Sequence, residues 1–298
     1  MVTMLVQYKE LIDTIEYLQS SKDIHLSNGK YSRSRSFHSH DKYEIYLFLS
    51  GDVEYFIENK VYSMFYGDLF TIRSDEFHSF IIKSDKIYER ISLRFDPLLA
   101  VLFSLPGFNL LECFDARPKG EKNHIRLDNK SLDEVLMLLG KLKSVLNHPV
   151  EGQEVLKLSY LLELLVIVNR LFISAPHDVY ALKPSPKLVP ILDYIEKNIA
   201  GELSLQTLGK QFYMNSSYLS WLFKSHTGVN VHEYITFKRI ALAKNLLNAG
   251  SSVTEACYRS GFRDYANFIR LFKKHTGIPP GHYAKRIQTA KLPPTPML

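Results

Sequence analysis

The sequence repeats itself once near its carboxyl end, and the two copies lie 49 residues apart. Residues 222–229 read LFKSHTGV, and residues 271–278 read LFKKHTGI. Tyr234 and Tyr283 follow the two copies at the same offset. Self-similarity at a fixed period indicates copies of one supersecondary unit. The carboxyl-terminal part of the chain is therefore expected to fold as two similar units.

A short helix and a tight turn are expected before each copy, within residues 205–215 and 254–263. A short helix, a tight turn and a second helix with polar exposed positions are typical of the helix-turn-helix motif. Gly261 supplies the positive φ that such a turn requires. Asn215 and Asp264 are the expected N-caps of the two second helices, which we call the recognition helices.

Residues 231–247 lie between the copies and are predicted to form one helix about 25 Å long. A spacer of this length could set two recognition helices about one DNA turn apart, ~34 Å, on one face of a duplex. The charge agrees with a polyanionic partner, because residues 186–298 hold 15 Lys and Arg against 6 Asp and Glu. The rest of the chain holds 22 against 25, so the total of +6 conceals two opposite charges. This asymmetry speaks against the alternative of a helical protein scaffold.

The spacing of residues over 187–286 resembles the DNA-binding domain of the AraC/XylS transcription regulators, which joins two helix-turn-helix motifs by a helix. The matching residues are Arg239, Ile240, Ala243, Lys244, Leu246, Leu247, Gly261, Phe262, Phe268, Phe272, Lys273, Lys274, Gly277, Pro279 and Tyr283. The resemblance implies a bacterial regulator that binds promoter DNA, most often as an activator of metabolic genes, with RNA polymerase as a partner when it activates. It also implies a small-molecule effector, with sugars the most frequent class.

The same resemblance implies which side chains contact DNA. By position, base contacts fall on Ser217, Ser220, Trp221, Tyr265, Ala266, Ile269 and Arg270. Arg270 is expected to discriminate most, because an Arg donates two hydrogen bonds to guanine, worth about 1–3 kcal/mol. Trp221 stands where the family commonly has Arg, so it either stacks on a sugar, contacts a thymine methyl group or is a partly buried packing residue. Contacts to phosphates are assigned to Lys224, Arg263, Lys273 and Lys274.

Residues 24–95 consist of short aromatic and β-branched segments separated by turns. Strands are predicted at 43–49, 53–58, 60–66, 69–73, 77–82 and 87–95, which favours antiparallel hairpins in a small barrel or sandwich. This half resembles the cupin barrel in the spacing of His38, His40, Glu44, Gly51, Gly67 and His78. Arg73 and Ile82 depart from the cupin pattern, which usually has Pro and Asn at these positions.

Three interpretations of the histidines stay open. His38, His40, Glu44 and His78 can hold a divalent transition metal such as Mn, Fe, Ni or Zn. With Arg90 they can instead line an effector pocket, or they are structural residues with satisfied hydrogen bonds. Arg90 and Arg94 alternate on one strand face and either bind a carboxylate or sugar hydroxyl or pair with surface acids.

Leucine-rich stripes of helical period predict two helices within residues 129–175. They cover one mouth of the barrel or form a homodimer interface, and the sequence does not separate the two. The chain is thus expected to comprise a cupin-like ligand-sensing domain (1–128), a helical pair (129–175), a proline-containing linker (176–187) and a DNA-binding domain (188–290). The fold class is α+β and multidomain, with an antiparallel β-barrel followed by an all-α double helix-turn-helix domain.

Two cysteines and the lack of an apolar run of about 20 residues favour a cytoplasmic protein that has no membrane partner. An amphipathic helix is predicted over about residues 2–18. These features together predict a homodimeric transcription regulator that is not an enzyme and requires no cofactor. The alternative is a metal-dependent cupin oxygenase or isomerase with an accessory DNA-binding domain, and the set of His38, His40, Glu44 and His78 is its only support.

Overall fold

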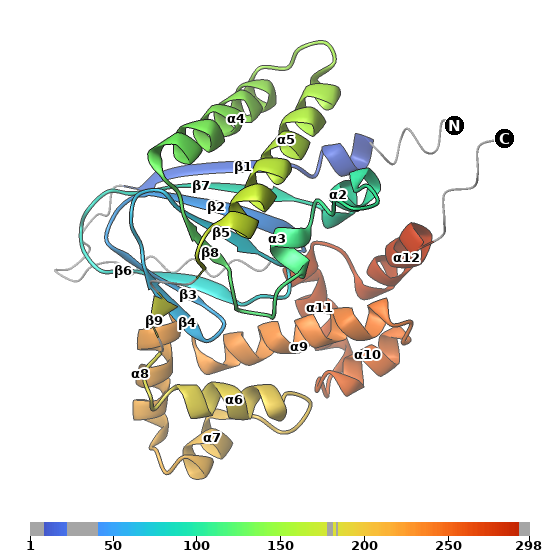
Figure 1. Ribbon diagram of the computed structural model, residues 1–298. Coiled ribbons are helices and arrows are strands. Elements are labelled where there is room, and N and C mark those ends of the chain that lie inside the picture. The colour runs from blue at the N-terminus through green and yellow to red at the C-terminus, as the bar shows by residue number, and fades with distance from the viewer. Residues whose placement is uncertain (1–8, 23–40, 178–180, 183, 292–298) are drawn as a thin grey trace.

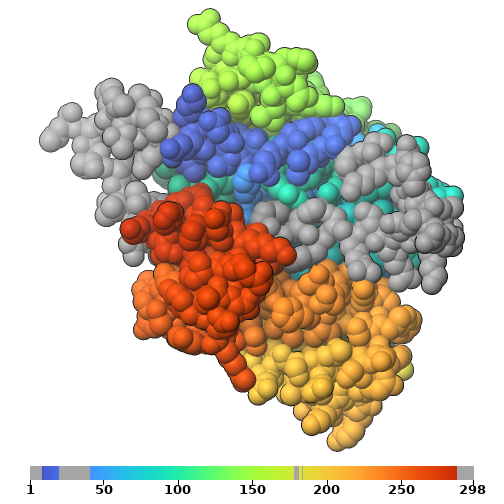
Figure 2. All heavy atoms as spheres, turned by 180° about the vertical axis from the view of Figure 1, so that it is seen from behind, coloured from blue at the N-terminus to red at the C-terminus, as the bar shows by residue number. Residues whose placement is uncertain are grey.

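The computed structural model describes residues 9–22, 41–177, 181–182 and 184–291 of the 298-residue chain. They form a β domain with two covering helices and, below it in Figure 1, a helical domain built from residues 184–291. Seen from behind in Figure 2, the orange and red helical domain lies directly against the blue and cyan β domain. The two halves therefore contact each other.

The β domain contains two antiparallel sheets that enclose an aromatic interior. The first has the order β1-β7-β2-β5-β8 and comprises β1 (Glu16–Lys22), β7 (Tyr88–Phe95), β2 (Tyr43–Ser50), β5 (Asp68–Ile72) and β8 (His124–Arg126). The second has the order β6-β3-β4-β9 and comprises β6 (His78–Ile82), β3 (Val53–Ile57), β4 (Lys60–Ser63) and β9 (Ala181–Leu182). The six strands expected over residues 43–95 are confirmed.

Three strands and two short helices were not expected from the sequence. The helix predicted over residues 2–18 is wrong at its carboxyl end, because helical structure ends at residue 12 and β1 starts at Glu16. Pairing with β7 satisfies the backbone groups of β1, and Ile12 and Ile15 are buried just before it. The linker contributes β9, whose two residues pair with β4. The added helices are α2 (Pro97–Phe103) and α3 (Glu112–Asp115).

The predicted helical pair consists of α4 (Asn129–Asn147) and α5 (Gln153–Ser174). Both helices pack on the outer face of the five-stranded sheet (Figure 1), where residues such as Leu139 and Leu165 join Leu47 and Leu93 in one apolar core. They therefore cover a sheet face rather than a barrel mouth. The alternation of β2 and β7 sends their other side chains into the domain interior.

The helical domain contains the two predicted helix-turn-helix units. Its helices are α6 (Val189–Lys197), α7 (Leu205–Gln211), α8 (Ser216–Thr227), α9 (Val231–Asn248), α10 (Val253–Arg259), α11 (Tyr265–Thr276) and α12 (Pro280–Lys291). The Asn215 and Asp264 side chains accept hydrogen bonds from the N–H groups of Tyr218 and Asn267, so both predicted N-caps are confirmed. Among the described residues no helix is both long and apolar enough to cross a membrane.

Each helix-turn-helix unit has its own core, and α9 belongs to both. Leu208, Leu219 and Phe223 are buried in the first unit, with Tyr234 from α9. Ala256, Phe268 and Phe272 are buried in the second unit, with Ala243 and Leu247 from α9. Because one rigid helix is part of both cores, it fixes the two recognition helices α8 and α11 relative to each other.

Candidate functional site

The exposed side of α8 presents the residues expected to contact DNA. Leu219, Leu222 and Phe223 point into the core, whereas Ser217 and Trp221 are exposed and Ser220 and Lys224 are half-buried. The Trp221 side chain is 60% exposed and stacks on Tyr218, with ring centroids 5.9 Å apart. Such exposure is unusual for a packing tryptophan and leaves its face and N–H available to a ligand.

The exposed side of α11 is more basic. Arg270, Lys273 and Lys274 are exposed on it together with Tyr265 and Ala266, and Ile269 is half-buried against the core. Arg270 Nη2 donates to Asn267 Oδ1 at 2.7 Å, which directs the guanidinium along the surface of the helix. Arg263, in the preceding turn, forms an exposed ion pair with Glu202 at 3.2 Å. A pair at this exposure is weak enough to exchange for a phosphate.

The residue with positive φ in the turn lies one position later in the first unit than in the second. Between α10 and α11 the backbone turns at Gly261 with φ +91°, and a Cβ there would lie 2.7 Å from the Ile199 carbonyl oxygen. Between α7 and α8 the positive φ falls on Tyr213, at +52°, whose side chain is 97% exposed. A tyrosine in this conformation is uncommon, and it lies next to the amino end of a recognition helix. The repeat did not single it out, because Phe262 at the same offset is buried.

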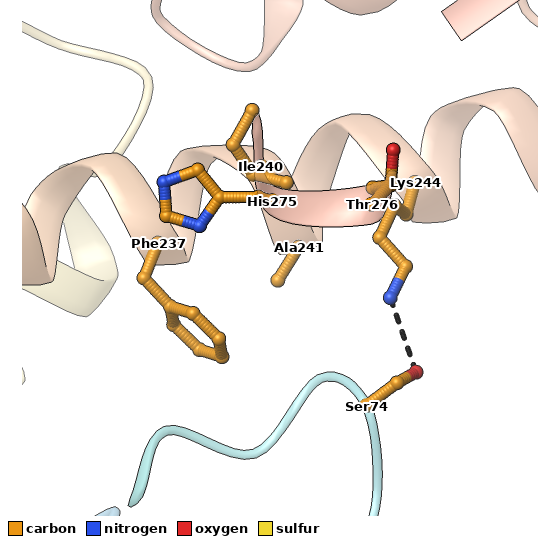
Figure 3. A pocket seen from close by; sticks show the side chains of 7 residues that line it. All are labelled: Ser74, Phe237, Ile240, Ala241, Lys244, His275 and Thr276. Atoms are coloured by element: carbon orange, nitrogen blue, oxygen red, sulfur yellow. Dashed lines mark hydrogen bonds between the residues drawn. The ribbon is translucent and has the colours of Figure 1, made fainter. Parts of the chain in front are cut away.

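The carboxyl end of each recognition helix lies against the β domain. At the end of α8, the Thr227 carbonyl oxygen accepts a hydrogen bond from the Ser79 hydroxyl of β6. At the end of α11, His275 and Thr276 line a small cavity that Ser74 of the β5–β6 loop closes from the other side (Figure 3). The β domain therefore contacts the carboxyl end of α8 and faces that of α11 across a small cavity.

Helix α9 forms the centre of the contact between the domains. Its residues Tyr234, Phe237, Lys238, Ala241 and Lys244 lie along one side of the helix, with Phe237 and Lys238 adjacent, and are all buried. This stripe explains why a helix expected to act as a spacer between the two units shows little amphipathic character, since both domains cover it.

An aromatic side chain from the β domain enters this stripe. The ring of Phe77 lies 4.7 Å from Tyr234 and 5.5 Å from Phe237, measured between centroids. Phe77 is fully buried and belongs to the same apolar core as the first helix-turn-helix unit. Part of the hydrophobic core of the DNA-contacting domain is thus supplied by the β domain.

Ion pairs flank the aromatic contact. Lys238 Nζ pairs with the Glu58 carboxylate of the β3–β4 turn and lies 2.8 Å from Glu196 Oε1 of α6. Burial alone would lower the pKa of Lys238, but these carboxylates, with Tyr234, hold that pKa well above its ordinary value. Lys244 Nζ lies 2.5 Å from Asp41 Oδ1 and 3.1 Å from Ser74 Oγ, the second contact being the dashed line of Figure 3.

Only part of the histidine set can be located. His38 and His40 lie outside the described residues. Glu44 and His78 face each other inside the β domain, with Oε2 and Nε2 3.5 Å apart. The Glu44 carboxylate also accepts from the Ser92 hydroxyl and from Arg94 Nε, the latter at 3.2 Å. Within residues 9–22, 41–177, 181–182 and 184–291, no group of three or more His, Cys, Asp or Glu residues is placed to hold a metal ion.

Arg90 is buried beside these residues, among aromatic rings. Its guanidinium carbon lies 5.3 Å from the ring centroid of Phe80, 5.5 Å from that of Tyr46 and 5.9 Å from that of Tyr88. The expectation that Arg90 or Arg94 pairs with surface acids is wrong, because both are buried and Arg94 pairs with the buried Glu44. Alternation on β7 points both arginines inward.

Comparisons with known proteins match both halves of the chain. A family model described as an AraC-like ligand binding domain matches residues 24–146, and one described as a helix-turn-helix domain matches residues 208–286. The chain is 25% identical to the HTH-type transcriptional activator RhaR of Enterobacter sp. (strain 638) over 85% of this chain and 88% of that protein.

Two further matches are confined to about a third of the chain. The uncharacterized HTH-type transcriptional regulator YijO of Escherichia coli (strain K12) is 34% identical over 36% of this chain, which spans 38% of YijO. A solved structure of a protein of unknown function from Listeria innocua is 37% identical over 34% of this chain and 98% of that one, with a TM-score of 0.33. The chain thus matches well under two thirds of the length of YijO.

Proposed function

Because the chain belongs to the AraC/XylS family of transcription regulators, we propose that it binds promoter DNA through α8 and α11 and regulates transcription in response to a small effector. The observation that carries this proposal is the pair of helix-turn-helix units whose exposed recognition faces α9 holds in one rigid body. Both faces are exposed opposite their cores, and the second carries a cluster of basic side chains.

The two recognition helices enter successive major-groove segments on one side of the duplex. Arg270 reads a guanine, while Lys224, Lys273 and Lys274 bind phosphates and position the protein. Arg263 exchanges Glu202 for a phosphate on binding. Tyr213 and Trp221 contact sugars or thymine methyl groups at the other end of the site, where α8 offers hydroxyl and aromatic groups rather than guanidinium groups.

Control by the effector uses the contact between the two domains. The β domain contacts α9 and the carboxyl end of α8, and it faces the carboxyl end of α11 across a small cavity. A change inside the β domain therefore alters how α8 and α11 are held. An effector that binds two arrangements of the domains unequally shifts their populations and hence promoter occupancy. The effector site lies in the β-domain interior at Glu44, His78 and Arg90.

The regulator acts as a homodimeric activator on RNA polymerase in the cytoplasm, where its operator DNA is located. The related RhaR is named an activator, which supports this direction of control. The outer side of α5 supports dimerisation, because Val155 and Ile173 are 70% and 68% exposed and lie five helical turns apart on one side. The enzyme alternative is not proposed, since the relatives with matches to both domains are named regulators.

The test is selection of bound fragments from sheared genomic DNA by the full-length protein, followed by sequencing. The proposal expects enrichment of a motif with two boxes about one helical turn apart, ~10 base pairs. A chain that enriches no motif, or that retains all fragments alike at every salt concentration, would not be a sequence-specific regulator.

A further inference from the structure

Arg90 is a buried cation for which the described part of the chain supplies no carboxylate at ion-pair distance. Only 9% of the residue is exposed, and its Nε has no hydrogen-bond partner. An arginine keeps its charge at any ordinary pH, so it cannot relieve burial by losing a proton. The three aromatic rings around it offset part of the lost hydration, but ring faces do not replace the hydrogen bonds of a guanidinium.

The nearby carboxylate is already engaged. Glu44 accepts from Arg94 and from the Ser92 hydroxyl, which accounts for its charge. Two arginines against one carboxylate leave the described interior with one uncompensated positive charge. Buried charges in proteins are normally paired, and an unpaired one strongly destabilises the protein that carries it.

Two further polar atoms in the same interior lack partners. The Tyr55 hydroxyl on β3 is buried without a hydrogen bond, and so is Nη2 of Arg94. Tyr55 stacks on Tyr46 with ring centroids 4.8 Å apart, and Tyr46 in turn packs against Arg90. Unsatisfied donors of this kind are rare in folded proteins and call for an explanation. Here they lie in the same interior as the uncompensated charge, and Tyr55 interacts electrostatically with both Arg90 and Arg94.

The site remains reachable at Arg90. The backbone of Arg90 is paired with a strand on each side, with β1 at Ser20 and with β2 at Phe48. Arg90 keeps 9% of its surface exposed, whereas the surrounding Tyr46 and Tyr88 are exposed by 1% or less, so Arg90 is the residue of this group that a ligand reaches first.

We propose that Arg90 binds the carboxylate of a monoanionic effector, with the Tyr55 hydroxyl and Arg94 Nη2 as further donors. This inference rests on the proposed effector-controlled function and names the class of effector. A single negative charge matches the one uncompensated positive charge, whereas a phosphate near −2 would exceed it. The guanidinium fork suits the two oxygens of a carboxylate, and the aromatic rings suit the flat face of an aromatic acid or the apolar face of a sugar acid.

Thermal unfolding of the full-length protein tests the proposal with paired probes that differ in charge. The pairs are formate with formamide, benzoate with benzamide, and galacturonate with galactose. Formate fits any carboxylate site, and the other two pairs separate an aromatic acid from a sugar acid. We expect carboxylates to raise Tm saturably, by about 2–4 °C at roughly tenfold excess over Kd, and neutral probes to leave it unchanged.

Two variants link the effect to Arg90. Arg90→Met should abolish stabilisation by carboxylates and, without any probe, should unfold no earlier than the wild type because an unpaired charge is removed. Arg117→Met is the matched control, since Arg117 forms a fully buried pair with Glu76 at 2.6 Å and its loss should lower Tm. The proposal is overturned if Arg90→Met lowers Tm as much as Arg117→Met, or if none of the three carboxylates stabilises the wild type.

DNA binding, measured on the same samples, keeps this inference separate from the proposed function. Arg90→Met should bind the selected operator as the probe-free wild type does. A wild-type protein that binds its operator but none of the three carboxylates would refute the effector class alone. If the protein bound carboxylates but selected no operator from genomic DNA, the regulatory function would instead be refuted.

Discussion

The Lys238 ammonium group on α9 forms a buried ion pair with the Glu58 carboxylate, 180 positions earlier in the chain. Glu58 is fixed in turn, because its other carboxylate oxygen accepts from the Phe77 N–H at 2.6 Å. The same turn thus presents a charge to α9 and positions the aromatic ring that packs on it. Any change in this turn is transmitted to the helix that holds both DNA-contacting units.

Replacing Lys238 by Met should lower the free energy of unfolding by about 3 kcal/mol, since it leaves the Glu58 charge buried. This loss lies at the lower end of the usual range for breaking a buried ion pair, because Lys119 Nζ still lies 3.6 Å from Glu58 Oε1. Urea unfolding measures the loss. The double variant with Glu58→Gln should recover at least half of it, and Lys83→Ala in the exposed pair with Glu54 is a control near zero. Additive losses in the double variant would contradict a direct pair.

Arg270→Ala should weaken binding to the selected operator by about 5- to 150-fold, which corresponds to the ~1–3 kcal/mol of a bidentate guanine contact. Binding to scrambled DNA should change little. Lys274→Ala, one helical turn further on the same helix, should weaken binding to both DNAs alike. It should also reduce the slope of log affinity against log salt concentration by about one. Fluorescence anisotropy at several salt concentrations measures both. If Arg270→Ala lost equal affinity for the two DNAs, Arg270 would not take part in base recognition.

His275 makes the contact between the domains sensitive to acid. Burial, with the positive charges of Lys274 and Lys244, lowers the pKa of His275 to about 4, compared with about 6.5 in an unfolded chain. Above pH 6.5 the imidazole is neutral in both states. Between about pH 6.5 and 4 only the unfolded chain gains the proton, so the stability contributed by neutral His275 is lost as the pH falls through this window.

The His275→Gln variant should therefore lose less stability than the wild type between pH 7 and pH 5. Chemical unfolding at the two pH values provides the comparison. His232→Gln, at an exposed position of the adjacent α9, serves as the control and should keep the wild-type pH dependence. If His275→Gln followed the wild type over the whole window, protonation of His275 would not contribute to the acid sensitivity.

Substituting Val155 and Ile173 together by Lys should convert the proposed dimer into monomers, because both side chains would bring charge into an apolar contact. Sedimentation velocity at several protein concentrations measures the shift. Leu102→Lys, at a position of α2 that is exposed by 43%, is the control and should leave the association unchanged. A double variant that sediments as the wild type would place the dimer interface elsewhere.

Local signals in the sequence determined the elements of this protein. The 49-residue repeat located both helix-turn-helix units, and the N-caps Asn215 and Asp264 were identifiable because a cap depends only on residues within one turn. The strands over residues 43–95 were equally predictable, since alternation and turn residues are local properties. The difference in charge between the two halves indicated which of them binds a polyanion.

Only the tertiary structure decided how these elements act on one another. Alternation predicted that Arg90 and Arg94 share a strand face, but not that Glu44 would pair with Arg94 and leave Arg90 among aromatic rings. Helix α9 was expected to act as a spacer between the two units, and the sequence did not indicate that Phe77 and Glu58 of the β domain contact it. The contacts between the domains join residues more than 100 positions apart, and their energies depend on the packing of both domains rather than on any local pattern.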